Sequence, residues 1–338
     1  MDKFFIDYRD PIFGIIIFFS VVLLIAILSY FWGIFRNQNN KNSIEKFVKN
    51  LELNSDFSDK NNELLRQLDT QSQIVLANTF AKNGDFEKAV TILLISLEHC
   101  DKENKDYILT TLGKVYFRAG FLERAKECFI QSIALKSQNE EALNFLSIIY
   151  EKLKDYKQSY EVLDVLAEFD INTNEAKNYI KTLSILNDTK QNFDQKIENL
   201  TKISHDFPLA KREILELFLQ NKEPLDKLKI FPNLKDCIDI LWNLKTPINL
   251  QNDDFASVFY ANKTTNDFKQ GEIFEINLLS NLRKNGFENA NLSFSYVCTK
   301  CKSSQPIFSY RCPFCLEVAS LKIVLKIVEN KYETSYTF

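Results

Sequence analysis

The chain reads LANTFAKNGDFEKAVTILLISL from 76 to 97, LGKVYFRAGFLERAKECFIQSI from 112 to 133 and LSIIYEKLKDYKQSYEVLDVLA from 146 to 167. Each stretch begins with Leu and a small residue, and an aromatic residue follows three positions after the small one. A turn leads to a second small residue, which an apolar residue follows after four positions. The stretches begin 36 and then 34 residues apart. A period near 34 with this order predicts helical hairpins of the tetratricopeptide (TPR) type.

The small residues Ala77, Gly113 and Ser147 are expected where the two helices of each hairpin approach each other. One hairpin cannot bury its apolar face alone, so the hairpins should stack into an α-solenoid. Seven Gly and seven Pro among 338 residues are too few for the turns of an all-β sandwich or barrel. We therefore predict a mainly α chain with TPR repeats at 70–171. A non-repetitive helical bundle is the alternative.

The first helix of each repeat should line the concave face of the solenoid. Four basic residues on that face form a predicted partner groove. An acidic or C-terminal peptide segment of a protein client would be a suitable ligand for it. The alternative is a solvated face without a partner. The predicted groove residues are Lys82, Lys114, Arg118 and Lys152.

The repeat pattern decays over 172–290, which we predict to contain degenerate helical repeats. Short amphipathic stretches persist at 175–188, 193–203, 210–220, 234–244, 253–263 and 271–287, interrupted by Pro224, Pro232 and Pro247. Gly286 is a plausible helix stop.

An uncharged apolar run, PIFGIIIFFSVVLLIAILSYFWGIF, occupies 11–35 and is long enough for a transmembrane helix. A cleaved signal peptide and a buried core helix are the alternatives. Four Lys or Arg follow the run within about 15 residues and two precede it, so we predict a single-pass membrane protein with a cytoplasmic C-terminal bulk. Residues 1–10 would be a short segment on the other side of the membrane, and 36–69 a linker or stalk.

Two C-x-x-C pairs carry the strongest chemical signal: Cys298 with Cys301, and Cys312 with Cys315. Two such turns facing each other predict one tetrahedral four-cysteine site for Zn or Fe. The segments SFSYV (293–297), IFSYR (307–311) and VASLKIVLKIV (318–328) read as strands, which gives a small four-cysteine β module of the zinc-ribbon kind at 291–338. A disulfide pair, a thioredoxin-like motif and an electron-carrying iron site are the alternatives.

The formal net charge of −3 argues against a generally basic nucleic-acid-binding protein. The chain lacks the phosphate-loop, zinc-protease and nucleophile-elbow motifs, so we expect no enzymatic activity. Self-association is left open by the sequence.

The order of apolar run, TPR repeats and terminal cysteine pairs resembles the lipopolysaccharide assembly protein B (LapB/YciM) family. That family ends in a rubredoxin-like module with the same cysteine spacing, matched here by YVCTKCKSSQPIFSYRCPFCLEVASLK (296–322). The family commonly has Gly after the second Cys of each pair, where this chain has Lys302 and Leu316. The resemblance implies a single-pass inner-membrane adaptor, with 1–10 as a short periplasmic segment, that presents the lipid A deacetylase LpxC to the membrane protease FtsH. A rubredoxin-like electron-transfer protein and a generic envelope scaffold are the alternative functions.

Overall fold

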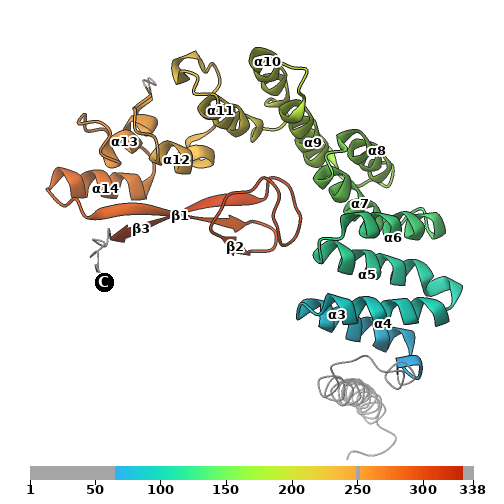
Figure 1. The fold of residues 1–338 in the computed structure, drawn as a ribbon. Helices are drawn as coiled ribbons and strands as arrows, with labels where there is room; N and C mark the ends of the chain where they lie inside the picture. Colours follow the sequence, from blue (N-terminus) through green and yellow to red (C-terminus); the bar gives the residue numbers. More distant parts are fainter. Residues whose placement is uncertain (1–64, 249–251, 330–338) are drawn as a thin grey trace, which may run out of the picture. The chain divides into compact units, whose positions relative to one another are not determined.

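The computed structural model describes residues 65–248 and 252–329 (Figure 1). The chain divides into two compact units, with the boundary between Ile149 and Tyr150. Both units are built mainly of helices, and the second also contains a small sheet. The prediction of a mainly helical chain with a small C-terminal sheet is confirmed for this part of the chain.

The first unit consists of consecutive antiparallel helices joined by short turns (Figure 1). They are α3 (Thr70–Lys82), α4 (Phe86–His99), the short 3-10 helix η1 (Lys102–Asn104), α5 (Lys105–Arg118), α6 (Leu122–Leu135) and most of α7 (Glu140–Lys152). Helices α3 and α4 form one hairpin, and α5 and α6 form the next. This is the TPR-like arrangement predicted from the repeated stretches.

Close contact at Gly113 explains why the repeats need small residues. A Cβ atom on Gly113 of α5 would lie 2.8 Å from the Cε1 and Cζ atoms of Phe129 on α6. Ala77 of α3 and Ala89 of α4 are fully buried. The Phe129 ring stacks on Phe145 of α7 with 5.4 Å between ring centroids. The small residues therefore bring the helices together, and aromatic rings fill the space beside them.

The turns between paired helices use the left-handed backbone region. Gly84 and Gly120 have φ of 89° and 85°, and Lys154 occupies the equivalent turn of the third repeat with φ of 62°. Only glycine adopts this conformation without a steric penalty from Cβ. The third repeat thus keeps the turn geometry although its residue is unfavourable.

The second unit continues with helices whose positions match the amphipathic stretches of the sequence. They are α8 (Tyr156–Ala167), α9 (Asn174–Asn187), α10 (Phe193–Ile203), α11 (Ala210–Gln220), η2 (Leu225–Lys227), α12 (Leu234–Trp242), α13 (Asp253–Ala261) and α14 (Phe274–Lys284). Gly286 follows α14 with φ of 83°, as expected of a glycine that ends a helix. Helices α9 to α14 thus occupy most of the described residues of 172–290, and their assignment as degenerate repeats stays a prediction.

The sheet has three strands, with β1 (Ala290–Cys298) between β2 (Ser304–Gln305) and β3 (Leu321–Glu329). Both pairings are antiparallel, and Cys298 lies opposite Leu321. The prediction of a strand over 307–311 was wrong. Within that segment, Arg311 forms only an isolated bridge with Val318.

The core of the second unit joins the helices to one face of the sheet. Phe259 of α13, Cys237 of α12 and Ile276 of α14 are buried in one cluster, and Ile323 and Leu325 of β3 pack against it. The small sheet is therefore anchored on the helices through this face, while a smaller cluster of Tyr296, Cys298, Cys312 and Leu321 lies at the cysteine turns.

The predicted inner-membrane, single-pass location is contradicted. Within residues 65–248 and 252–329, none of the helices combines the length and the apolar character needed to cross a membrane. The apolar run at 11–35 on which that prediction rested lies outside the described residues, as do 1–10 and most of 36–69.

Candidate metal centre

The four cysteines of the two C-x-x-C pairs meet at one point. Their sulfur atoms all lie within 4.8 Å of one another. The Sγ atoms of Cys298 and Cys315 are 3.6 Å apart, and those of Cys301 and Cys312 are 3.7 Å apart. A disulfide would require about 2.05 Å. The four sulfurs are therefore grouped without a covalent bond between them.

Each cysteine pair sits in the same hydrogen-bonded turn. In the first, the Lys302 N–H donates to the Cys298 carbonyl at 3.0 Å, and the Cys298 N–H donates to the Ser303 carbonyl at 2.9 Å. In the second, the equivalent bonds run from Leu316 to Cys312 at 2.9 Å and from Cys312 to Glu317 at 2.8 Å. Two matched turns thus aim two sulfurs each at a common centre.

The residue after each second cysteine adopts positive φ, which is 61° at Lys302 and 65° at Leu316. These are the positions where the LapB family commonly has glycine. The turn geometry is kept despite the change of residue, at a cost of about 1 kcal/mol for each side chain in the left-handed region.

The thiols of the cluster have different affinities for protons. Burial works against the Cys298 thiolate, but hydrogen bonds from Ser320 and from backbone N–H groups outweigh it and lower the pKa of Cys298 to about 6. Burial first, and then the neighbouring sulfurs, raise the pKa of Cys315 to about 12. Four thiolates at this spacing repel one another, so their full deprotonation at neutral pH requires a cation among them.

The sulfur arrangement fits a tetrahedral metal ion. Zn–S bonds of about 2.3 Å in a tetrahedron place the sulfurs about 3.8 Å apart, close to the separations found here. Four sulfur donors suit Zn or Fe and fill the coordination sphere, as in structural sites. Cys298 and Cys312 are buried, and Cys301 and Cys315 are exposed.

An ion pair fastens the second cysteine turn to the helices of the same unit. Arg311 directly precedes Cys312, and its Nε atom donates to Glu151 Oε2 at 2.9 Å. The side chains of Arg311 and Glu151 are only 12% and 10% exposed. The Arg311 guanidinium also lies over the ring of Tyr179, 5.6 Å from its centroid. Tyr310 stacks on the same Tyr179 ring at 6.2 Å. The turn is therefore clamped by charge and by aromatic packing.

A second buried network fastens β1 to helices α11 and α12. Arg212 donates to both carboxylate oxygens of Asp239, at 2.7 and 2.9 Å, and the Tyr296 hydroxyl donates to Asp239 Oδ2 at 2.8 Å. Phe308 lies on the guanidinium at 3.8 Å. Although burial opposes the charge, the hydrogen bonds and charge of Asp239 raise the pKa of Arg212. Such a paired, hydrogen-bonded charge is stable in the interior only while both partners remain.

Two further carboxyl groups of α11 adjoin this network, and one of them, Glu216, accepts a hydrogen bond from Arg212 Nε at 3.0 Å. Burial first, and then the nearby Glu216, raise the pKa of Glu213 to about 8. Burial likewise raises the pKa of Glu216. The Tyr310 hydroxyl is buried close to both carboxyl groups, and burial raises its pKa as well. Glu213 is therefore largely protonated at neutral pH.

Three of the four predicted groove residues lie at helix ends. Lys82, Arg118 and Lys152 occupy the last turns of α3, α5 and α7, where a positive charge complements the helix dipole. Lys114 forms an ion pair with Glu141 at 2.7 Å. Use of these residues as a peptide groove stays a prediction.

Sequence reasoning missed both fastening networks. A signal was present in α12, where Asp239 interrupts the apolar stretch CIDIL (237–241), since a carboxylate on an apolar helix face needs a buried partner. The identity of that partner, Arg212, has no signature in the sequence. The Glu151 and Arg311 pair joins residues 160 positions apart.

Comparison with known proteins gives limited similarity. No family model matches the chain. The uncharacterized protein ycf37 of Pyropia yezoensis is 27% identical over 180 residues, which cover 50% of this chain and 97% of that protein. MamA from Desulfovibrio magneticus RS-1 has a TM-score of 0.36 and 17% identity, covering 46% of this chain and 86% of MamA. YrrB, described as a TPR protein with an unusual peptide-binding site, has a TM-score of 0.36 and 18% identity, covering 58% and 93%. At these TM-scores neither structure adds evidence on function.

Proposed function

We propose that the chain is a non-enzymatic protein-interaction scaffold whose small sheet module is held folded by one metal ion bound to Cys298, Cys301, Cys312 and Cys315. The observation that carries the proposal is the grouping of the four sulfurs within 4.8 Å of one another. A module of about 50 residues gains from such a staple because its own core is small.

The fastening networks extend the effect of the ion to the helices. Arg311, next to a ligand cysteine, pairs with Glu151 of α7. Tyr296, two residues before the ligand Cys298, donates a hydrogen bond to Asp239 of α12. A bound ion that fixes the two turns therefore also fixes the residues that bond to Glu151, α11 and α12 within the second unit. The ion's role is structural, since four thiolates leave no open coordination position for chemistry.

The narrower proposal is that the scaffold acts as an adaptor for LpxC and FtsH. It rests on the resemblance to the LapB family in the repeats and in the cysteine spacing. The groove residues Lys82, Lys114, Arg118 and Lys152 are proposed to contact the client.

A redox role is the second candidate, because Cys301 and Cys315 are exposed and an iron ion bound to them would lie near the surface. Metal analysis of the purified full chain, together with voltammetry, separates the two. A colourless zinc protein without a reversible potential supports the scaffold, and a reversible iron couple contradicts it.

The test of the scaffold is binding by the purified full chain to purified LpxC and to purified FtsH, followed by the same assay on two variants. Cys315→Ser should lower binding, and Cys100→Ser, at a half-buried cysteine outside the cluster, should not. Loss of binding in both variants, or in neither, contradicts the structural role of the ion. Failure of both proteins to bind the wild-type chain contradicts the adaptor role alone.

A further inference from the structure

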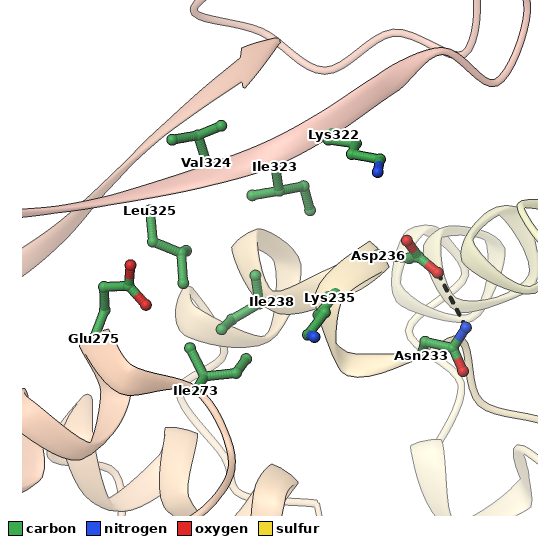
Figure 2. Close-up of a pocket in the computed structure, with 10 residues that line it drawn as sticks. All are labelled: Asn233, Lys235, Asp236, Ile238, Ile273, Glu275, Lys322, Ile323, Val324 and Leu325. Carbon is green, nitrogen blue, oxygen red and sulfur yellow. Dashed lines mark hydrogen bonds between the residues drawn. The ribbon is translucent and has the colours of Figure 1, made fainter. Parts of the chain in front are cut away.

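We propose that the outer edge of β3 is a docking site for an extended peptide segment of a partner protein, which joins the sheet as an added antiparallel strand. This inference goes beyond the scaffold function and is independent of it, because it uses the sheet edge rather than the helical repeats. A groove of about 620 Å³ lies along this strand (Figure 2). Its other walls come from α12 and from the start of α14.

The groove follows the edge of the strand and not one of its faces. Its lining includes four consecutive residues of β3, 322–325, and no residue of β1 or β2. Because neighbouring side chains of a strand point to opposite faces, four consecutive residues can line one groove only along the edge. In the part of the chain that the structure describes, the sheet ends at β3. Alternate N–H and C=O groups along that edge are therefore directed away from β1 and can pair with another strand.

The inner side of the groove is apolar. Ile323 and Leu325 pack against the helical core cluster, and Figure 2 shows them facing Ile238 of α12 and Ile273, which precedes α14. A strand added beside β3 would place every second side chain over these four residues. The matching peptide therefore has apolar residues at alternate positions, as in known strand-addition complexes.

Charges at the two ends of the groove determine which charged residues the peptide should carry at each of its ends. Lys322 and Lys235 lie at one end, and Glu275 lies beside Leu325 at the other (Figure 2). Asp236, also at the lysine end, accepts a hydrogen bond from the Asn233 amide at 3.3 Å. Both existing pairings of the sheet are antiparallel, so we assign the same direction to the added strand. Its carboxyl-terminal end then meets the lysines and should be acidic, and a basic residue should precede the apolar positions, near Glu275.

The lysines also explain why this edge does not pair indiscriminately. Charged side chains on an edge strand disfavour contact with a strand of the same charge. Lys322 and Lys326 are exposed on β3. Lys322, at the lysine end of the groove, would exclude basic residues there and admit acidic ones, whereas Lys326 is outside the groove lining, so the edge is selective rather than merely open.

The test is a fluorescence-anisotropy titration of the full chain with two fluorescein-labelled octapeptides. TTKTITVE carries the predicted pattern, and TTETITVK has the two charges exchanged. We expect TTKTITVE to bind about tenfold more tightly, because charge complementarity fixes register. The double variant Lys235→Glu and Lys322→Glu should reverse this preference. The matched control, Lys190→Glu with Lys245→Glu, changes the net charge equally at exposed positions outside the groove and should keep it.

Several outcomes would overturn the assignment to a partner peptide. Equal affinities, absence of binding, or a preference that the Lys235 and Lys322 changes leave intact would each do so. Binding that appears only after residues 330–338 are removed would assign the groove to the chain's own end instead. A dimer that dissociates in the double variant would assign it to a second copy. Circular dichroism melting of each variant verifies that it is folded.

Discussion

The Arg311 side chain is paired with Glu151, 160 positions earlier in the chain, with the Nε and Oε2 atoms 2.9 Å apart. Both side chains are almost fully buried. This pair connects a residue adjacent to a candidate metal ligand with helix α7. Its partners have lost most of their hydration, so each depends on the other for compensation.

Removing one partner should therefore cost more than removing both. We expect Glu151→Ala to lower the free energy of unfolding of the full chain by about 3 kcal/mol, because it leaves a buried guanidinium without a counter-ion, bonded only to the Leu316 carbonyl. The double variant Glu151→Ala with Arg311→Met should lose less. Urea denaturation followed by circular dichroism measures both. Glu161→Ala, which breaks the exposed pair with Lys157 at 3.8 Å, is the control and should change stability by less than about 0.5 kcal/mol. Equal losses in the Glu151 and Glu161 variants would contradict the clamp.

Removal of the metal ion should destabilise the sheet module and the helices fastened to it. We expect a strong chelator to lower the melting temperature of the full chain, and Cys312→Ser to reproduce that effect, because the buried Cys312 sulfur is one of the four donors. Differential scanning calorimetry with metal analysis measures both changes. Cys128→Ser, at a buried cysteine of α6 outside the cluster, controls for the loss of a buried thiol and should leave the metal content unchanged. A melting temperature indifferent to chelator would rule out a structural ion.

The acidic pair on α11 should make stability depend on pH. The pKa of Glu213 is raised from 4.5 to about 8, chiefly by burial. Between these two values the folded chain keeps a proton that the unfolded chain has released. The free energy of unfolding must therefore fall as pH rises from about 4.5 to about 8 and then level off. Glu216, whose pKa is also raised by burial, contributes in the same direction.

Glu213→Gln removes the ionisable group while keeping its shape. We expect this variant to be more stable than the wild type at pH 8, by more than about 1 kcal/mol, and to lose much of the slope between pH 5 and pH 8. Urea denaturation at several pH values measures the slope. Glu223→Gln, at a half-buried position after α11, is the control. A slope unchanged in Glu213→Gln would show that other groups are responsible.

Local sequence patterns predicted much of this fold, but they could not predict which residues far apart in the chain pair with each other. The stretches at 193–203 and 210–220 coincide with α10 and α11, because amphipathic spacing and the breaks between the stretches are local properties. The meeting of the four cysteines was predictable for a similar reason, since two C-x-x-C turns have few other uses together.

The segment 307–311 shows where such reasoning fails. Its β-branched and aromatic residues are typical of a strand, yet Phe308 packs on Arg212 and Tyr310 packs on Tyr179. Both aromatic rings pack on side chains of helices α11 and α9, so the segment is held in place without a strand partner. Only the tertiary arrangement determines which of these two uses of such residues applies.

The left-handed residue Lys302 offers a way to improve the metal module. Its φ of 61° places Cβ close to the backbone, whereas glycine has no such contact. We expect Lys302→Gly to raise the free energy of unfolding of the metal-bound chain by about 1 kcal/mol, since the strain removed exceeds the added entropy of the unfolded chain. Lys300→Gly, in the same turn and without positive φ, should instead be neutral or destabilising. Urea denaturation with metal present distinguishes them, and a Lys302→Gly variant no more stable than Lys300→Gly would show that the turn carries no strain.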